Sequence, residues 1–437
     1  MTSGYTSSPR FATCKRRRVD VSFDGGDITS DAGGALLLRE AERRLGLIAD
    51  VSRRLPEPRR RKSIQHSSKS MLMQRVSGIA LGYEDLNDHE TLRDDIAMQT
   101  ATDKDDRLAS PSTLGRLERR ADREWLWAVH EVLVSKFIAS FKTPPKRLIL
   151  DFDATDDPVH GRQEGRFFHG YYDHYCFLPL YVFCGSHLLT AYLRPSNIDG
   201  AKHAGAILKL LVERLRETWP KVKITFRADS GFCRHRIMNW CDRNAVDYVI
   251  GLARNPVLLR LSQSRHIQAE LQFHQTGRKA TLFSDIEYGA KTWAYPRRVV
   301  VKAEHMEGGS NPRFIVTNLA TPAAKLYKKV YCARGDMENR IKEQQLGLFA
   351  DRTSSTRWWA NQARLLLSSL AYVLVDYVRR VGLVGTELAN AQVWTLRTKL
   401  FKIGAVIVRN TRRVRFHLAG GFPLQDVFWL AAKKLAG

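Results

Sequence analysis

Residues 146–252 alternate between strand-like and helix-like patterns, and this alternation limits the possible folds more than any other feature of the chain. Short apolar runs indicate strands, whereas apolar residues spaced three or four apart indicate helices. The expected elements are strands over 147–154, 171–184 and 187–194, a helix over 204–218, a strand over 223–228, a helix over 234–244 and a strand over 247–253. Gly185-Ser186 predicts a two-residue hairpin turn between the second and third strands.

The order of these elements is βββαβαβ. Strands joined by short turns pair antiparallel, and strands joined through a helix pair in parallel with a right-handed crossover. The chain is therefore expected to be an α/β protein with a mixed sheet. The order resembles the core of ribonuclease-H-like proteins, and we predict that fold for residues 146–253 and 331–382.

The segments around this core have different patterns. Residues 1–145 are expected to form a helical region after a short strand over 19–23, with helices over 35–45 and 71–81 and a further helix capped by Ser112. Residues 254–330 interrupt the alternation with strands over 297–302 and 313–318, which indicates a β-rich insertion subdomain. Residues 383–437 are expected to form a hairpin, over 404–408 and 413–418, and a helix from Pro423 onward.

Two interpretations fit the helical N-terminal region. Its short helices and basic loops, such as the one around Arg59 to Lys62, match a helix-turn-helix DNA reader. They match equally well a helical bundle that only supports the core.

The balance of charge indicates a polyanionic partner. The 437 residues include 70 Lys and Arg against 45 Asp and Glu, a net charge of +25. Nucleic acid is the usual partner of so basic a protein. With 44% hydrophobic residues the chain is expected to be globular, and no apolar run reaches the roughly 18 residues of a membrane-spanning helix. No secretory signal is recognised, and the six cysteines lack the spacing of a zinc site.

Acidic residues follow two of the predicted strands. Asp153 lies at the end of the first strand, and Asp229 directly follows the strand over 223–228. Ligands of an α/β sheet gather where its strands end, and carboxylates are the ligands that Mg²⁺ prefers. Asp151 lies two residues before Asp153 and therefore on the same face, so either or both are candidates. Taken alone, Asp229 equally fits the N-cap of the helix over 234–244.

A third acid lies on a helix predicted over 336–346. Arg334, Glu338 and Lys342 recur every four residues and so share one helix face, and Tyr331 precedes Arg334 by three residues. A ladder of ion pairs on a solvated face explains this spacing. In the functional interpretation, Glu338 binds a metal ion and the two bases bind phosphate beside it.

These residues together resemble the three signature blocks of DDE transposases from bacterial insertion sequences. The blocks are Asp153-Ala-Thr155, Asp229-Ser-Gly-Phe232 and Tyr331-x2-Arg334-x3-Glu338. The branch in question carries a β-rich insertion between the second Asp and the Glu. Separations of 76 and 109 residues between the three acids leave room for it. The resemblance extends over roughly residues 20–435.

The resemblance implies an enzyme that cuts and joins DNA with two Mg²⁺ ions, for which Mn²⁺ substitutes. Asp153, Asp229 and Glu338 would hold the ions, of which one activates water and then a 3′-hydroxyl and the other stabilises the leaving oxygen. Tyr331 and Arg334 would contact a phosphate near the cleaved end. The implied partners are transposon ends and target DNA, bound by a homodimer. The implied location is the bacterial cytoplasm, at the nucleoid.

Two further positions bear on how DNA would be bound. The extended signature of the family carries a lysine seven residues after the Glu, where this chain has Gln345, and Lys342 is the expected phosphate-binding substitute. Trp293 in the insertion either stacks on a flipped base of the DNA, as an aromatic residue does in hairpin-forming relatives, or packs in a core. Two other functions remain open: a different ribonuclease-H-like nuclease, and an inactive DNA-binding relative of a transposase.

Overall fold

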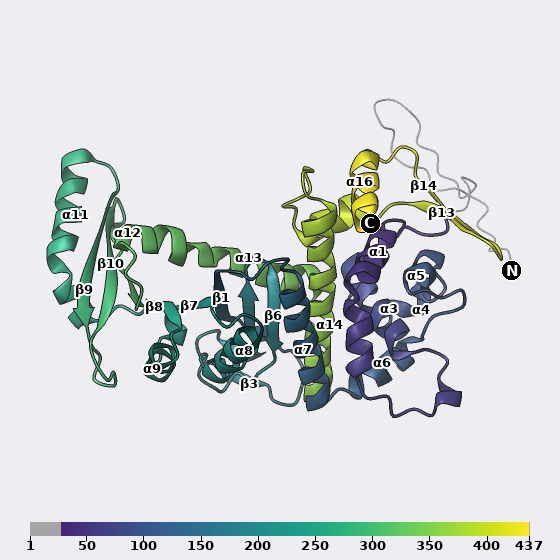
Figure 1. Cartoon of the computed structure of the whole chain (residues 1–437), viewed down its shortest axis with the longest axis horizontal. Helices are drawn as coiled ribbons and strands as arrows, with labels where there is room; N and C mark the ends of the chain where they lie inside the picture. Colours follow the sequence, from purple (N-terminus) through teal and green to yellow (C-terminus); the bar gives the residue numbers. More distant parts are fainter. Residues whose placement is uncertain (1–27, 437) are drawn as a thin grey trace, which may run out of the picture.

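The computed structural model describes residues 28–436, and a nine-stranded mixed sheet forms its centre (Figure 1). The core strands lie side by side in the order β6 (His187–Tyr192), β5 (Leu180–Cys184), β1 (Arg147–Ala154), β7 (Lys223–Ala228) and β8 (Asp247–Leu252). β1 pairs antiparallel with β5 and parallel with β7, and β7 pairs parallel with β8. This order confirms the predicted ribonuclease-H-like α/β fold. The strand predicted over 19–23 lies outside the described residues.

Helices cover both faces of the core sheet. On one face, α8 (Ala204–Thr218) and α9 (His235–Arg243) bury their apolar residues against Leu150, Phe152 and Phe226. On the other face lies α14 (Trp358–Tyr377), whose Tyr372 ring packs edge-on against Phe183 with centroids 5.7 Å apart. The sheet thus separates two apolar cores, as strands buried on both faces require.

The long strand predicted over 171–184 is divided in the structure. β4 (His174–Phe177) ends before Leu178-Pro179, and β5 begins after it. Pro179 has no backbone N–H with which to continue the ladder, so the chain bends there. β4 instead forms a small three-stranded sheet with β2 (Asp157–Pro158) and β3 (Phe167–His169).

The insertion extends the core sheet. Its elements are α10 (Pro256–Leu261), α11 (Gln263–Thr276), β9 (Ala280–Tyr288), β10 (Arg297–Met306), β11 (Gly309–Ser310) and β12 (Arg313–Thr317). β12 pairs antiparallel with β8, and β10 then pairs with β12 and β9. The two predicted strands correspond to β10 and β12, whereas α10, α11 and β9 were not predicted. Figure 1 shows α11 beside β9 and β10 at one end of the molecule.

A long helical segment returns from the insertion to the core (Figure 1). It begins with α12 (Ala323–Lys325), continues through a π-helical turn over Leu326–Tyr331 and a 3₁₀ turn over Cys332–Arg334, and leads into α13 (Gly335–Lys342). A second π-helical turn over Glu343–Gly347 follows. The helix predicted over 336–346 therefore exists but changes its winding at residue 343.

The N-terminal region is helical, as predicted. It comprises α1 (Ala35–Leu45), α2 (Leu47–Arg54), α3 (Ser68–Leu81), α4 (His89–Leu92), α5 (Ile96–Ala101), α6 (Pro111–Arg119) and α7 (Arg123–Ala139). The predicted cap at Ser112 is wrong. Ser110 caps α6 by accepting a hydrogen bond from the Thr113 backbone N–H, because Pro111 occupies the first helical position.

The C-terminal part packs on the N-terminal helices. α15 (Val393–Leu396) is followed by a hairpin of β13 (Ala405–Arg409) and β14 (Val414–Leu418), and α16 (Gln425–Ala436) is the last helix. Ser30 exchanges backbone hydrogen bonds with Ala405, so the first described residues lie against this hairpin. Within residues 28–436, no helix combines the length and the apolar character that crossing a membrane requires.

Candidate active site

Two of the three predicted acids come together because β1 and β7 run parallel and in register. Phe152 on β1 pairs with Ala228 on β7, so the next residues, Asp153 near the end of β1 and Asp229 just after β7, lie side by side at the carboxyl edge of these strands. Asp229 Oδ1 accepts a hydrogen bond from the Gly231 backbone N–H at 2.9 Å. Asp229 therefore caps a 3₁₀ turn over Ser230–Phe232 and not α9, and its second oxygen keeps its capacity for a ligand.

The same register separates the two candidates on β1. Asp151 pairs across the strands with Arg227, whose guanidinium binds both carboxylate oxygens, with Arg227 Nη2 2.7 Å from Asp151 Oδ2. Both side chains are buried, at 4% and 7% exposure. Asp153 faces the carboxyl edge without such a bidentate partner. Burial is the main cause that raises the pKa of Asp151, and the Arg227 charge opposes it.

Arg227 is a residue that sequence reasoning missed. Its guanidinium also donates to the backbone carbonyls of Val330 and Ala333, in the helical segment that carries Tyr331 and Arg334. It thereby ties that segment to β1 and β7. One signal existed in the sequence: Arg227 follows Asp151 by 76 residues, the separation of Asp153 and Asp229.

Arg334 joins the third acid to the first. Its Nη1 donates to Asp153 Oδ2 at 3.3 Å, and its Nη2 donates to Glu338 Oε1 at 2.5 Å. Glu338 lies in the first turn of α13 and is half exposed. The i,i+4 ion pair predicted for Arg334 and Glu338 is therefore present, and its Arg334 also contacts Asp153.

The electrostatics of Asp153 report the crowding of these acids. Burial of the carboxyl group, and then the nearby charges of Asp229 and Glu338, raise the pKa of Asp153 to about 7, and Arg334 opposes the shift. Carboxylates that raise one another's pKa lack sufficient positive charge nearby. A bound cation would supply that charge.

Tyr331 occupies a space that only a glycine leaves open. A Cβ atom on Gly251 in β8 would lie 2.6 Å from the Tyr331 hydroxyl and 2.7 Å from the Ser230 backbone nitrogen. The missing side chain lets Tyr331 approach the turn that follows Asp229. Burial raises the pKa of Tyr331, so its hydroxyl remains a hydrogen-bond donor.

Gln345, which stands where the family signature has lysine, binds the loop that follows β1. Its Nε2 donates to the Asp156 carbonyl and to Asp157 Oδ1, both at 2.9 Å. Asp157 is fully buried, and burial raises its pKa well above the usual range. Lys342 is exposed, and no ion pair with it occurs in the described part of the chain.

Trp293 lies away from these acids, in the connection between β9 and β10. Its ring is partly buried and packs edge-on against Tyr288, with centroids 5.4 Å apart. This contact supports packing, one of the two roles predicted for Trp293.

A pocket beside Asp229 adds two basic residues that sequence reasoning did not select. It is lined by Ser230, Gly251, Arg254, Arg313 and Tyr331, among others. Arg254 and Arg313 are exposed, and neither takes part in an ion pair within residues 28–436. Two guanidinium groups without ion-pair partners among the described residues, next to the carboxylate edge, can bind the backbone phosphates of a nucleic-acid strand.

The donor set matches a hard divalent cation. Asp153, Asp229 and Glu338 offer carboxylate oxygens, with neither His nor Cys among them, which is the ligand type of Mg²⁺ and Mn²⁺. Burial and then the charges of Asp229 and Glu338 raise the pKa of Asp153, and a cation bound between these acids would oppose that shift. Arg334 supplies part of this positive charge.

Comparison with known proteins finds a family whose model matches nearly the whole chain. The model of a family described as "Transposase DDE domain group 1" matches residues 11–437. The chain is also distantly similar to a solved structure, the cryo-EM structure of the piggyBac transposase synaptic complex with hairpin DNA. That likeness has a TM-score of 0.45 and 11% identity, and it covers 84% of this chain and 79% of the other. No curated protein matches the chain.

Proposed function

This chain belongs to the transposase DDE domain group 1 family, and on that premise we propose that it cleaves DNA at the inverted-repeat ends of an insertion sequence and joins those ends to target DNA. The protein is accordingly a transposase, a DNA-binding enzyme of a family that uses divalent metal ions. The observation that carries the finer proposal is the neighbouring position of Asp153 and Asp229 at one sheet edge, with Glu338 linked to Asp153 through Arg334.

In this proposal Asp153, Asp229 and Glu338 would hold two Mg²⁺ ions, for which Mn²⁺ would substitute. When bound, the ions supply charge stabilisation for the attacking and leaving oxygens of an in-line displacement at phosphorus. The bidentate pairing of Asp151 with Arg227 supports Asp153 as the first ligand, because a carboxylate that already binds a guanidinium through both oxygens is a poor metal ligand.

The surrounding side chains orient the DNA. Arg334 lies between two of the acids, where its guanidinium would also donate to a phosphate oxygen of the DNA. Tyr331 donates a hydrogen bond from its hydroxyl to the same phosphodiester. Arg254 and Arg313 hold the strand next to Asp229. Water first cleaves the phosphodiester to leave a 3′-hydroxyl, which then attacks a phosphodiester of the target.

The proposal also covers the domains of the chain, its partners and its location. We assign residues 146–253 and 331–382 to the catalytic core, 254–330 to the insertion subdomain, 1–145 to DNA binding or support and 383–437 to a C-terminal hairpin and helix. The net charge of +25 supports double-stranded DNA as the partner. A homodimer is proposed because two ends must join in one event. The place of action would be the bacterial cytoplasm, at the nucleoid.

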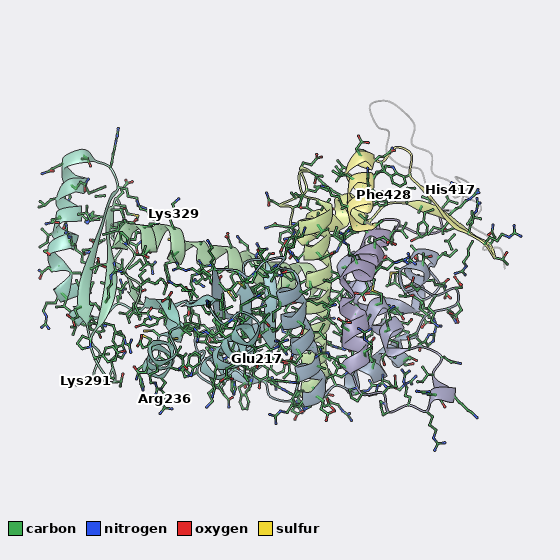
Figure 2. All side chains as sticks on the ribbon, in the orientation of Figure 1. Glu217, Arg236, Lys291, Lys329, His417 and Phe428 are labelled. Atoms are coloured by element: carbon green, nitrogen blue, oxygen red, sulfur yellow. The ribbon has the colours of Figure 1, made fainter. Side chains whose placement is uncertain are left out.

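The proposal is tested with duplex DNA that carries the terminal repeats of the element encoding this protein. In the presence of Mg²⁺ we expect new 3′-hydroxyl ends and strand-transfer products. Asp153→Asn, Asp229→Asn and Glu338→Gln should each abolish both products and leave DNA binding intact, since only the metal ligands are lost. Glu217→Gln, at an exposed acid on α8 (Figure 2), is the matched control and should be fully active. Full activity of any of the three site variants would overturn the assignment.

A further inference from the structure

We propose that Glu270, His274 and His305 form a transition-metal site in the insertion, of the type that binds Zn²⁺. One ligand atom of each residue lies within 4.8 Å of the others. This site is separate from the carboxylate edge and does not depend on the proposed transposition chemistry. Its donors are two imidazoles and one carboxylate, which favour Zn²⁺ over Mg²⁺.

Two elements bring the three side chains together. Glu270 and His274 are four residues apart on α11, so they project from the same face of the helix. His305 comes from β10, against which α11 packs. Glu270 and His274 are exposed and form no ion pair or side-chain hydrogen bond within residues 28–436, so both are available as ligands.

His305 is already oriented for metal binding. It is 9% exposed, and its Nδ1 lies 3.0 Å from Ser310 Oγ. When Nδ1–H donates to this hydroxyl, the Nε2 lone pair is left for a metal ion. A hydrogen bond from the second ring nitrogen is the usual way in which proteins fix a metal-binding histidine.

The neighbouring acid is not a competing ligand. Glu304 precedes His305 on β10 and therefore points to the opposite face of the strand. Its carboxylate is bound by Lys279, Lys302 and Asn311. The Glu-His-His set is thus distinct from the charged network on the other face.

A metal ion would add to a small apolar contact. The buried residues between α11 and the β9–β10 ribbon are three alanines, Ala269, Ala280 and Ala303, and the partly buried Phe273 and Leu282 pack against them. Alanine methyl groups bury little apolar area, so this cluster is small. Metal ions and disulfides commonly reinforce such small contacts. Here the ion would join α11 to β10 directly.

The geometry requires only small movements. Tetrahedral Zn²⁺ with bonds of about 2.0–2.2 Å needs ligand atoms roughly 3.4 Å apart. Rotation of the exposed Glu270 and His274 side chains closes the difference, while His305 stays in place. The fourth position is left for water, since these are the three protein ligands that the described residues provide here.

The test measures metal binding by the full-length protein, not its activity. Zn²⁺ and spectroscopic Co²⁺ are titrated in excess Mg²⁺, which occupies oxygen-only sites. We expect one Zn²⁺ per chain and visible Co²⁺ bands of nitrogen coordination. His274→Ala and Glu270→Gln should lose the Co²⁺ bands, and Ser310→Ala should weaken binding about tenfold. Because His274 and Glu270 are exposed, these variants should fold normally.

Two controls make the outcome decisive. His417→Ala changes an exposed histidine on β14, which lies at the far end of the molecule from α11 (Figures 1 and 2), and should keep the Co²⁺ bands. Asp153→Asn should also keep them, which separates this site from the proposed active site. Zn²⁺ should slow hydrogen exchange over residues 263–276 in the wild type but not in His274→Ala. Equal Zn²⁺ affinity of wild type and His274→Ala, or no binding by either, would overturn the proposal.

Discussion

Asp151 and Arg227 form a buried, bidentate ion pair between β1 and β7, two residues before Asp153 and Asp229 on their respective segments. The pair lies directly beneath the two acids of the candidate site. Arg227 also reaches the carbonyls of Val330 and Ala333. One guanidinium therefore fixes the two strands and the segment before Glu338 relative to one another.

This relationship predicts opposite effects of two similar substitutions. Asp151→Asn should lower the free energy of unfolding by about 3–5 kcal/mol, because it leaves the buried Arg227 charge without its partner. Asp153→Asn should raise that free energy at pH 8, because burial disfavours the ionised form of Asp153. Urea unfolding of the two variants without metal measures both effects. A neutral Asp151→Asn together with a destabilising Asp153→Asn would reverse the roles assigned here.

A side chain at position 251 should lower stability and slow DNA cleavage for a steric reason. Gly251→Ala places a Cβ atom 2.6 Å from the Tyr331 hydroxyl and 2.7 Å from the Ser230 backbone nitrogen. We expect a loss of about 1–3 kcal/mol in stability and slower DNA cleavage, since Tyr331 and the turn after Asp229 are both displaced. Gly404→Ala, where a Cβ meets no atom within 4 Å, is the control and should be silent. Adding Tyr331→Phe should not restore full stability, because the contact with the Ser230 backbone persists.

Two replacements of Gln345 should differ in their rate of DNA cleavage. Gln345→Ala removes the hydrogen-bond donor to the buried Asp157 Oδ1. The other oxygen of this carboxyl group, Oδ2, already lacks a hydrogen bond in the described structure. We expect a stability loss of about 1–3 kcal/mol and reduced cleavage, because the loop after Asp153 loses its anchor. Gln345→Lys should retain more activity, since an ammonium group can still donate hydrogen bonds to the Asp156 carbonyl and Asp157 Oδ1. Cleavage rates of the two variants measure this, with Gln268→Ala on the exposed side of α11 as control. A wild-type cleavage rate for Gln345→Ala would show that Gln345 does not anchor the loop.

The buried His130 should make the protein less stable as the pH falls below 6.5. Its Nδ1–H donates to the Leu126 carbonyl at 2.8 Å, and its Nε2 accepts from the Ala191 N–H at 3.1 Å, so the ring is neutral. Burial lowers the pKa of His130 to about 4. The unfolded chain, with a histidine pKa of about 6.5, binds this proton first. The stability that His130 contributes is therefore fully present above pH 6.5 and is lost as the pH falls toward 4.

Comparison with His130→Gln isolates this contribution. The unfolding free energy of the wild type minus that of the variant should fall by about 2 kcal/mol between pH 7 and pH 5. Urea unfolding at the two pH values gives the difference. A difference that does not change with pH would mean that His130 titrates alike in both states.

Much of the core could be predicted because its signals are local. The bounds of β1, α8 and β7 agree with the predicted segments, since each is a short apolar or amphipathic run with a clear end. By contrast, α11 escaped prediction. It exposes Ile267 and Leu271 and buries only Ala269, so its apolar residues do not mark one buried face. The break at Pro179 and the cap at Ser110 were misjudged because a proline decided each boundary.

Local sequence patterns were sufficient to predict the order of the elements, the acids at the ends of β1 and β7, and the helix face shared by Arg334 and Glu338. No local pattern indicated that Arg227 binds Asp151, that Arg334 contacts Asp153, or that β12 pairs with β8. The cluster of Glu270, His274 and His305 likewise arises only when α11 packs on β10. The difference arises from the separation in sequence over which each kind of interaction acts. Periodicity and capping act between residues a few positions apart, whereas strand register and the pairing of buried charges depend on contacts between distant parts of the chain.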